Sequence, residues 1–193
     1  MHYRAIIICW LCCGLSCCSQ NETDSCIQPA WALQSSIIKQ ANNWVATGSA
    51  SLQSGHSHHM GYFTWAQQGA DFTIDISGPM HIPIATIEGD AQGSVVHTAE
   101  SAQPITLSQW MQQYIGYPVG DSALRAMLLG RPQTNNLSWR YHYPYQAHYQ
   151  HYHVTWERYH CFPIGYRPQK IAIELDPEHT LTIFVHDWYE RYA

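Results

Sequence analysis

Residues 71–82 read D-F-T-I-D-I-S-G-P-M-H-I, a strand pattern that runs directly into a turn. Every second position of the strand is apolar, the period of a sheet with one buried face: Phe72, Ile74 and Ile76. The residues that follow supply turn chemistry, because glycine permits positive φ and Pro79 fixes its own φ. The turn tip carries Met80, although polar residues are usual there. This stretch predicts an antiparallel sheet with an apolar loop tip.

The composition is that of one domain with a substantial core. The chain has 193 residues, of which 46% are hydrophobic, 13% aromatic and 12% charged, and its formal net charge is −5. This balance excludes a disordered chain, and the lack of a strongly basic stretch argues against nucleic acid as a partner. No apolar run reaches the roughly 20 residues that a membrane-spanning helix requires.

The first residues are typical of a secretory signal. One cation, Arg4, precedes an apolar run over residues 5–15, which is too short for an anchor helix. The run leads into L-S-C-C-S, which resembles a bacterial lipoprotein signal with its leucine three residues before the acylated cysteine. Counting from that leucine makes Cys18 the lipidated residue, with Cys17 as the alternative. We therefore expect a signal peptide over residues 1–17.

The residues after the acylated cysteine indicate where the protein is sorted. Ser19 is not aspartate, so the rule for retention in the inner membrane is not met and outer-membrane sorting is implied. Residues 18–29 are small and polar, which predicts a flexible tether between the lipid and a domain over residues 30–193. Cys26 and Cys161 can pair in an oxidising periplasm or remain thiols, and the sequence leaves both open.

Hydrophobic periodicity predicts one helix followed by strands. Residues 30–45 place apolar side chains at helical spacing, and Gly48 is expected to end that segment. Strand patterns with turn signals between them cover residues 61–65, 71–77, 82–88, 94–98, 137–145, 151–159, 170–175 and 181–186.

Two amphipathic helices interrupt the strands. Residues 107–115 are opened by Thr106 or Ser108 and stopped by Gly116, and residues 121–129 are capped by Asp121 or Ser122 and stopped by Gly130. Strands, then two helices, then strands again is an order that predicts an α+β fold with the helices packed on one face of an antiparallel sheet.

The chain carries no pattern typical of an active site. It has no G-x-S-x-G, no H-E-x-x-H and no prominent carboxylate pair, so we expect neither an enzyme nor a cofactor. His151 and His153 share one side of a strand, a spacing that suits a metal, but no acidic residue follows before Glu157. We assign no metal ligand, and a histidine-rich metal-binding lipoprotein stays as a lesser alternative.

Three stretches together resemble the LolB family of outer-membrane lipoproteins. The first, G-Y-F-T-W with D-F-T-I-D-I-S-G-P-M, is similar to the family's F-x-W, strand and P-L-G turn. The second runs from I-T-L-S-Q-W-M-Q-Q-Y-I-G-Y-P-V to L-R-A-M-L-L-G-R-P and resembles the family's helix pair. The third, P-Q-K-I-A-I-E-L with L-T-I-F-V-H-D-W, resembles its final strands. The chain departs from the pattern at His81 in place of glycine, at Met127 in place of tryptophan, and over the Tyr/His-rich residues 141–153.

The resemblance implies an open, incomplete antiparallel β-barrel with helices across its mouth and an apolar cavity. It implies a receptor that accepts acylated lipoproteins from the periplasmic carrier LolA, holds their acyl chains and inserts them among outer-membrane phospholipids. We expect a monomer, lipid-anchored at the periplasmic face of that membrane. The main alternative is a lipoprotein of similar fold that binds another lipid or hydrophobic molecule.

The resemblance also locates the functional residues. By position, Met80 after Pro79 is the apolar residue of a loop that enters the membrane, and the alternative is that Met80 folds back over a gap. The expected cavity lining combines alternate strand positions with the apolar faces of two helices: Phe63, Trp65, Phe72, Ile74, Ile76, Trp110, Met111, Tyr114 and Leu128. A register shift of one residue would reverse the strand contribution.

Overall fold

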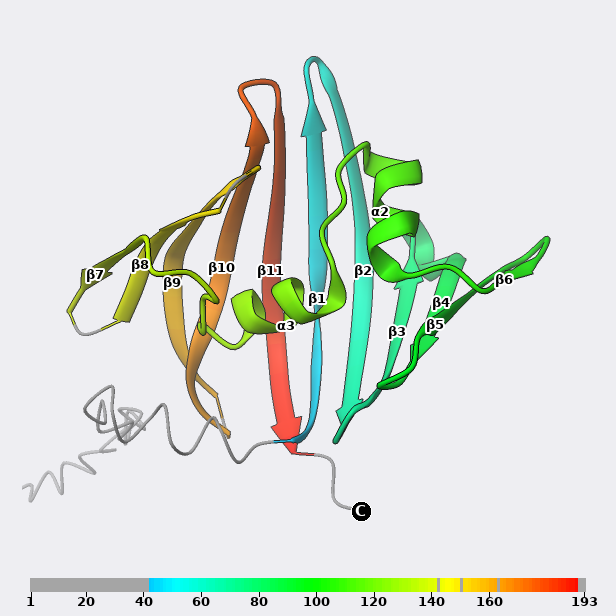
Figure 1. Cartoon of the computed structure of the whole chain (residues 1–193), viewed down its shortest axis with the longest axis horizontal. Coiled ribbons are helices and arrows are strands. Elements are labelled where there is room, and N and C mark those ends of the chain that lie inside the picture. The colour runs from blue at the N-terminus through cyan, green and yellow to red at the C-terminus, as the bar shows by residue number, and fades with distance from the viewer. Residues whose placement is uncertain (1–41, 142, 150, 163, 191–193) are drawn as a thin grey trace, which may run out of the picture.

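The computed structural model describes residues 42–190 except positions 142, 150 and 163, and it forms one open, curved antiparallel sheet (Figure 1). The expected signal peptide, tether and residues 30–41 of the domain lie outside the described residues. The strands are β1 (Asn43–Ser54), β2 (Ser57–Gln68), β3 (Asp71–Ser77), β4 (Pro83–Gly89), β5 (Ser94–Thr98), β6 (Ala102–Gln103), β7 (Leu137–Arg140), β8 (Tyr143–His148), β9 (His153–Phe162), β10 (Gly165–Asp176) and β11 (His179–Glu190).

The strand order is β6-β5-β4-β3-β2-β1-β11-β10-β9-β8-β7. Two meanders therefore meet at the centre of the sheet, where the first described strand pairs with the last over most of its length. The short strands β6 and β7 form the two edges, and they do not pair with each other. The predicted incomplete barrel is thus present as an 11-stranded sheet that does not close.

Both helices lie over one face of the sheet, α2 (Leu107–Ile115) in front of the β2 side and α3 (Asp121–Leu128) across β11 and β1 (Figure 1). The start of α2 is a capping box, in which Thr106 Oγ1 accepts the Gln109 N–H at 3.1 Å and Gln109 Oε1 accepts the Thr106 N–H at 2.8 Å. Gly116 ends α2 with a φ of 79°, as predicted. The N-cap of α3 is Gly120, so the predicted caps of that helix were wrong.

Tryptophans organise the core between the sheet and the helices. Trp44 lies at the sheet centre, with its ring centroid 5.0 Å from that of Trp188 and 5.8 Å from that of Trp65. Trp156 on β9 donates from Nε1 to the Met127 carbonyl oxygen at 2.9 Å and so ties α3 to the sheet. Among residues 42–190, neither helix has the length and apolarity to cross a bilayer.

The predicted helix over residues 30–45 was wrong where the structure describes it. From Asn43 onward the chain is β1, in which Trp44, Ala46 and Gly48 are buried at the two-residue period of a strand. Gly48 is an interior strand position and not a stop, because a Cβ there would lie 2.3 Å from the Phe184 carbonyl oxygen.

Other boundaries moved outward. The single strand expected over residues 137–145 is the hairpin of β7 and β8, and β2, β10 and β11 extend beyond their predicted limits. Cys161 is disulfide-bonded, and its partner lies outside the described residues.

Candidate functional site

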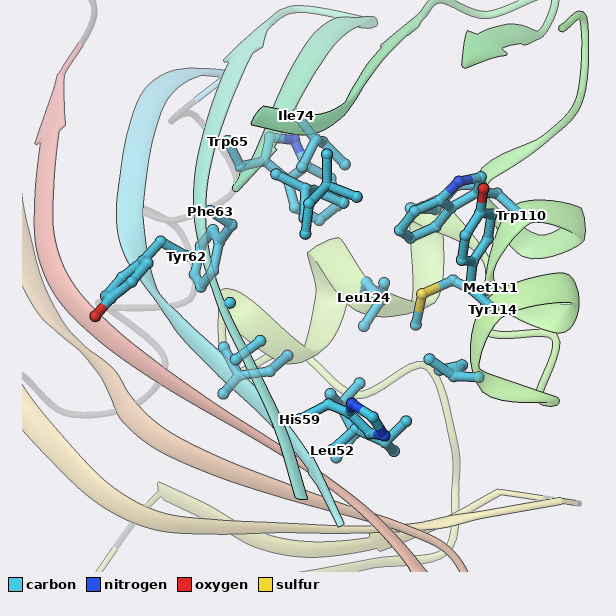
Figure 2. A pocket seen from close by; sticks show the side chains of 18 of the residues that line it. Leu52, His59, Tyr62, Phe63, Trp65, Ile74, Trp110, Met111, Tyr114 and Leu124 are labelled. Atoms are coloured by element: carbon cyan, nitrogen blue, oxygen red, sulfur yellow. The ribbon is translucent and has the colours of Figure 1, made fainter. Parts of the chain in front are cut away.

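A pocket of about 410 Å³ lies between the sheet and the two helices. Its walls come from β1, β2, β3, β4 and β11 on one side and from α2 and α3 on the other, and almost all its side chains are apolar. Figure 2 shows Met111 and Tyr114 of α2 across the pocket from Phe63 on β2. Within the described chain, this is a concave apolar surface of the kind that binds hydrophobic ligands.

The structure places eight of the nine predicted lining residues on the pocket wall: Phe63, Trp65, Ile74, Ile76, Trp110, Met111, Tyr114 and Leu128. The pairing of β2 with β3 explains the strand contribution, since Phe63 lies opposite Ile76 and Trp65 lies opposite Ile74. The predicted alternation and the predicted face therefore coincide with the concave side of the sheet.

Phe72 is the exception among these residues, because it does not line the pocket. Its ring packs 6.0 Å from that of Trp65 and fills the space above Gly89, where a Cβ would lie 2.4 Å from the Phe72 ring. Phe72 therefore belongs to the buried core that packs against Trp65 of the pocket wall. The strand period predicted its face correctly but could not predict how far along the strand the pocket extends.

The sheet centre supplies lining residues that the sequence analysis missed: Ala50, Leu52, Leu181 and Ile183. Ala50 and Leu52 were missed because the helix prediction before them left β1 unrecognised. Leu181 and Ile183 do alternate within a predicted strand, so their period was visible. The sequence could not predict which residues of β1 pair with them, since the pairing of β1 with β11 joins residues more than 100 positions apart.

The loop between β3 and β4 projects an apolar side chain into solvent. Met80 is 85% exposed, and it lies in the short 3₁₀ turn η1 (Pro79–His81). The Gly78 N–H donates to the Ile82 carbonyl oxygen at 2.8 Å and closes the base of the loop. The alternative in which Met80 folds back over a gap does not fit this exposure.

Apolar exposure continues from the loop tip to the rim of the pocket. Ile82 is 57% exposed, Ile84 is 43% exposed and Met60 is 49% exposed. Ile84 and Met60 also line the pocket, and Ile84 packs against Gly78 at the base of the loop. An apolar surface therefore connects the loop with the pocket, and contiguous surfaces of this kind mark interaction sites.

A polar network joins the α2–α3 connection to the strand ends. Tyr117 donates its hydroxyl hydrogen to Asp176 Oδ2, and His179 Nδ1 lies 2.9 Å from both carboxylate oxygens of Asp176. His179 Nε2 lies 2.8 Å from the Ser54 hydroxyl oxygen. The hydrogen bond from the His179 side chain is the main cause that lowers the pKa of Asp176. This network ties the segment between the helices to two hairpins.

The histidines show no metal cage in the described part of the chain. His148 and His153 stack with ring centroids 4.1 Å apart, and His153 Nδ1 lies 3.4 Å from Glu174 Oε2. Residues 42–190 contain no group of three or more histidine, cysteine, aspartate or glutamate side chains placed to hold a metal ion. The absence of a metal site stays a prediction.

Solved structures define the fold class. A DUF1329 family protein from Desulfovibrio piger superposes with a TM-score of 0.59 at 11% identity, covering 86% of this chain and 93% of that one. A LolA superfamily protein from Nitrosomonas europaea superposes with a TM-score of 0.56 at 12% identity, covering 83% of this chain and 94% of the other. At these identities the likeness concerns the fold alone: the open sheet and its two helices share the fold of these two proteins.

Sequence comparison assigns the family. The profile of the family described as "Outer membrane lipoprotein LolB" matches residues 42–188. The outer-membrane lipoprotein LolB of Alkalilimnicola ehrlichii is 24% identical over 164 residues, covering 78% of each chain. The chain belongs to the LolB family of outer-membrane lipoproteins. The expected family and localisation are thereby confirmed.

Proposed function

We propose that this protein receives acylated lipoproteins from the periplasmic carrier LolA, holds their acyl chains in the pocket between the sheet and the helices, and inserts them into the outer membrane. The observation that carries the proposal is the apolar pocket of about 410 Å³, whose rim runs into the exposed loop at Met80. Family membership supports a lipoprotein cargo.

An apolar pocket is needed because exposing acyl chains to water carries a large free-energy cost. Each methylene group removed from water contributes about 0.8 kcal/mol, so a bare lipid-modified protein cannot cross the aqueous periplasm at a useful rate. The pocket supplies an apolar lining from both the sheet and α2, and no covalent step is required. Transfer then follows differences in affinity, from the carrier to this protein and from this protein to the bilayer.

The loop at Met80 gives the proposal a delivery step. Met80 and Ile82 are the most exposed large apolar residues of the loop, and Ile84 continues this surface to the pocket. An apolar tip that enters the lipid surface brings the pocket rim to the bilayer, because the burial of its side chains favours that orientation. We assign membrane contact to Met80, presented by Pro79.

The test is a two-step transfer assay. LolA loaded with a labelled lipoprotein is mixed with the form of this protein that lacks residues 1–18, and liposomes of outer-membrane phospholipids are then added. The label is expected first on this protein and then in the liposomes. A folded protein that takes up no label would contradict the receptor function, and selective uptake of a free lipid in its place would favour the alternative of another hydrophobic ligand.

A further inference from the structure

A second pocket, of about 290 Å³, lies where β1 begins and β2 ends, beside α3. It is distinct from the apolar pocket, and none of the described residues lines both. Its polar lining comes from β2, from α3 and from the segment after α3, and includes Gln67, Ser122, Arg125, Arg131 and Gln133. None of the described lining residues is an aspartate or glutamate.

Positive charge is concentrated around this pocket in a chain whose net charge is −5. Residues 42–190 contain six lysines and arginines, and Arg125, Arg131 and Arg167 are three of them. Burial, and then the charge of Arg125, lowers the pKa of Arg131 to about 10. Burial, and then the charge of Arg131, lowers the pKa of Arg167 to about 10. The charge of Arg131 is thus repelled by that of Arg125 and by that of Arg167.

No carboxylate in the described chain forms an ion pair with Arg125 or Arg167. Arg167 is 1% exposed, its Nη1 donates only to the Tyr166 carbonyl oxygen at 3.3 Å, and its Nε has no hydrogen-bond partner among the described residues. Arg167 is not among the described residues that line the pocket, but its charge acts on Arg131, which does line it. Arg167 therefore adds to the positive potential that favours an anion in the pocket.

The other polar groups of the pocket suit an oxyanion. Gln67 is already satisfied, since its Oε1 accepts from Trp65 and its Nε2 donates to the carbonyl oxygens of Gly69 and Asp71, so it forms a fixed wall. Ser122 is an exposed hydroxyl in the first turn of α3, where the helix dipole favours negative charge. Each guanidinium group carries five N–H donors, so Arg125 and Arg131 can share the several oxygens of one phosphate group with the Ser122 hydroxyl while keeping other contacts.

From this juxtaposition we propose that the pocket formed by Ser122, Arg125 and Arg131 binds the phosphate group of a free phosphate ester or of a phospholipid head group. The second source would bring a lipid to a site outside the acyl-chain pocket. The inference does not depend on the proposed lipoprotein transfer, because the two pockets have no lining residue in common in the part of the chain that the structure describes.

The test is calorimetric titration of the full mature chain in a non-ionic detergent. The probes are inorganic phosphate, sn-glycerol 3-phosphate and dihexanoylphosphatidylglycerol. Arg125→Gln is expected to weaken binding by about tenfold or more, the usual effect of losing a charge-assisted hydrogen bond. The matched control is Arg158→Gln, which removes an exposed arginine on β9 and should bind like the parent protein. Arg125→Lys keeps the positive charge but loses the bidentate geometry of the guanidinium group. Its affinity for the probes should therefore lie between those of Arg125→Gln and Arg158→Gln.

The probes separate the two sources. Tighter binding of the short-chain lipid than of glycerol phosphate supports a phospholipid head group, and equal binding of the two supports a free phosphate ester. The proposal is overturned if no probe binds saturably, or if Arg125→Gln binds as tightly as Arg158→Gln. Circular dichroism of each variant shows whether a loss of binding reflects a loss of folding.

Discussion

Met80 and His81 both have a φ of 57° in the loop between β3 and β4. The left-handed region costs a non-glycine residue about 1–2 kcal/mol, so this loop is held in shape against its own preference. His81 stands where the family pattern has glycine, and its ring packs 4.7 Å from that of Tyr62. That contact, with the hydrogen bond between Gly78 and Ile82, keeps the Met80 side chain pointing outward. Strain that persists at an exposed tip is typical of functional loops.

The first prediction concerns this tip. Met80→Glu should leave uptake of cargo from LolA unchanged and reduce delivery to liposomes by about tenfold, because a buried carboxylate opposes insertion at a cost of a few kcal/mol. The two steps of the transfer assay are measured separately. Tyr189→Glu is the control, since Tyr189 is an exposed apolar residue at the far end of β11. Normal delivery of cargo to liposomes by Met80→Glu would contradict the proposed membrane contact of Met80.

At the level of single residues, the sequence predicted the pocket wall well where local period was sufficient. Phe63 and Trp65 alternate on β2, and Trp110, Met111 and Tyr114 repeat at helical spacing on α2, so their shared faces could be read from position alone. The arginine pocket had no such signal. Arg125 and Arg131 lie beside Gln67 only because the folded chain brings α3 against the ends of β1 and β2.

At the level of elements, β1 shows how a sequence pattern can mislead. Trp44 and Val45 continued a helical spacing that began upstream, yet this segment pairs with strands on both sides. The strand is favoured over a helix because β1 pairs with both β2 and β11, whereas an isolated helix gains little stability from propensity alone. By contrast α2 was predicted nearly to the residue, because its capping box and its terminal glycine are local signals.

The second prediction tests the packing of β1. Gly48→Ala should lower the free energy of unfolding by about 1–3 kcal/mol, because the added Cβ would lie 2.3 Å from the Phe184 carbonyl oxygen and 2.8 Å from the Phe63 ring. Urea denaturation followed by tryptophan fluorescence measures the change. Gly93→Ala is the comparison, since nothing lies within 4 Å of a Cβ built there. Equal stability of the two variants would contradict the close approach.

The third prediction concerns the network of Tyr117, Asp176 and His179. The pKa of Asp176 is lowered from 3.8, chiefly by its hydrogen bond with His179. Its stabilising contribution is therefore fully present above the unfolded-state pKa and is lost as the pH falls through the lower folded-state pKa. As the pH falls below about 4, the parent protein should lose more stability than Asp176→Asn, because residue 176 does not titrate in that variant.

Urea midpoints at half-unit pH steps measure this difference. Asp71→Asn is the control, because it removes an exposed carboxylate outside the network and should keep the acid-dependent loss of the parent protein. Parallel midpoint curves for the parent protein and Asp176→Asn below pH 4 would show that the network adds no pH-dependent stability.

At the level of the whole molecule, β1 and β11 meet at the centre of the sheet (Figure 1). Side chains of both strands line the apolar pocket. The pairing of Ala50 with Ile183 brings together side chains from the two ends of the described chain. No local pattern could predict this pairing, and the family resemblance alone implied the open sheet. The same topology leaves α2 and α3 as a cover on one face, so pocket and loop can be altered independently.

The last prediction uses that independence to separate holding cargo from delivering it. Ala50 lines the pocket from the sheet centre, and its small side chain leaves space that a larger one would occupy. Ala50→Phe should therefore reduce the uptake of acylated cargo from LolA severalfold, whereas Met80→Glu should affect only the later step. Ala102→Phe adds the same ring to an exposed position on the edge strand β6 and should leave uptake intact. Thermal unfolding shows whether the new ring fills open space or overpacks the core, since overpacking costs typically about 1–3 kcal/mol. Full uptake by a stable Ala50→Phe protein would mean that the acyl chains are held elsewhere. Reduced uptake with unchanged stability would place them between the sheet and α2.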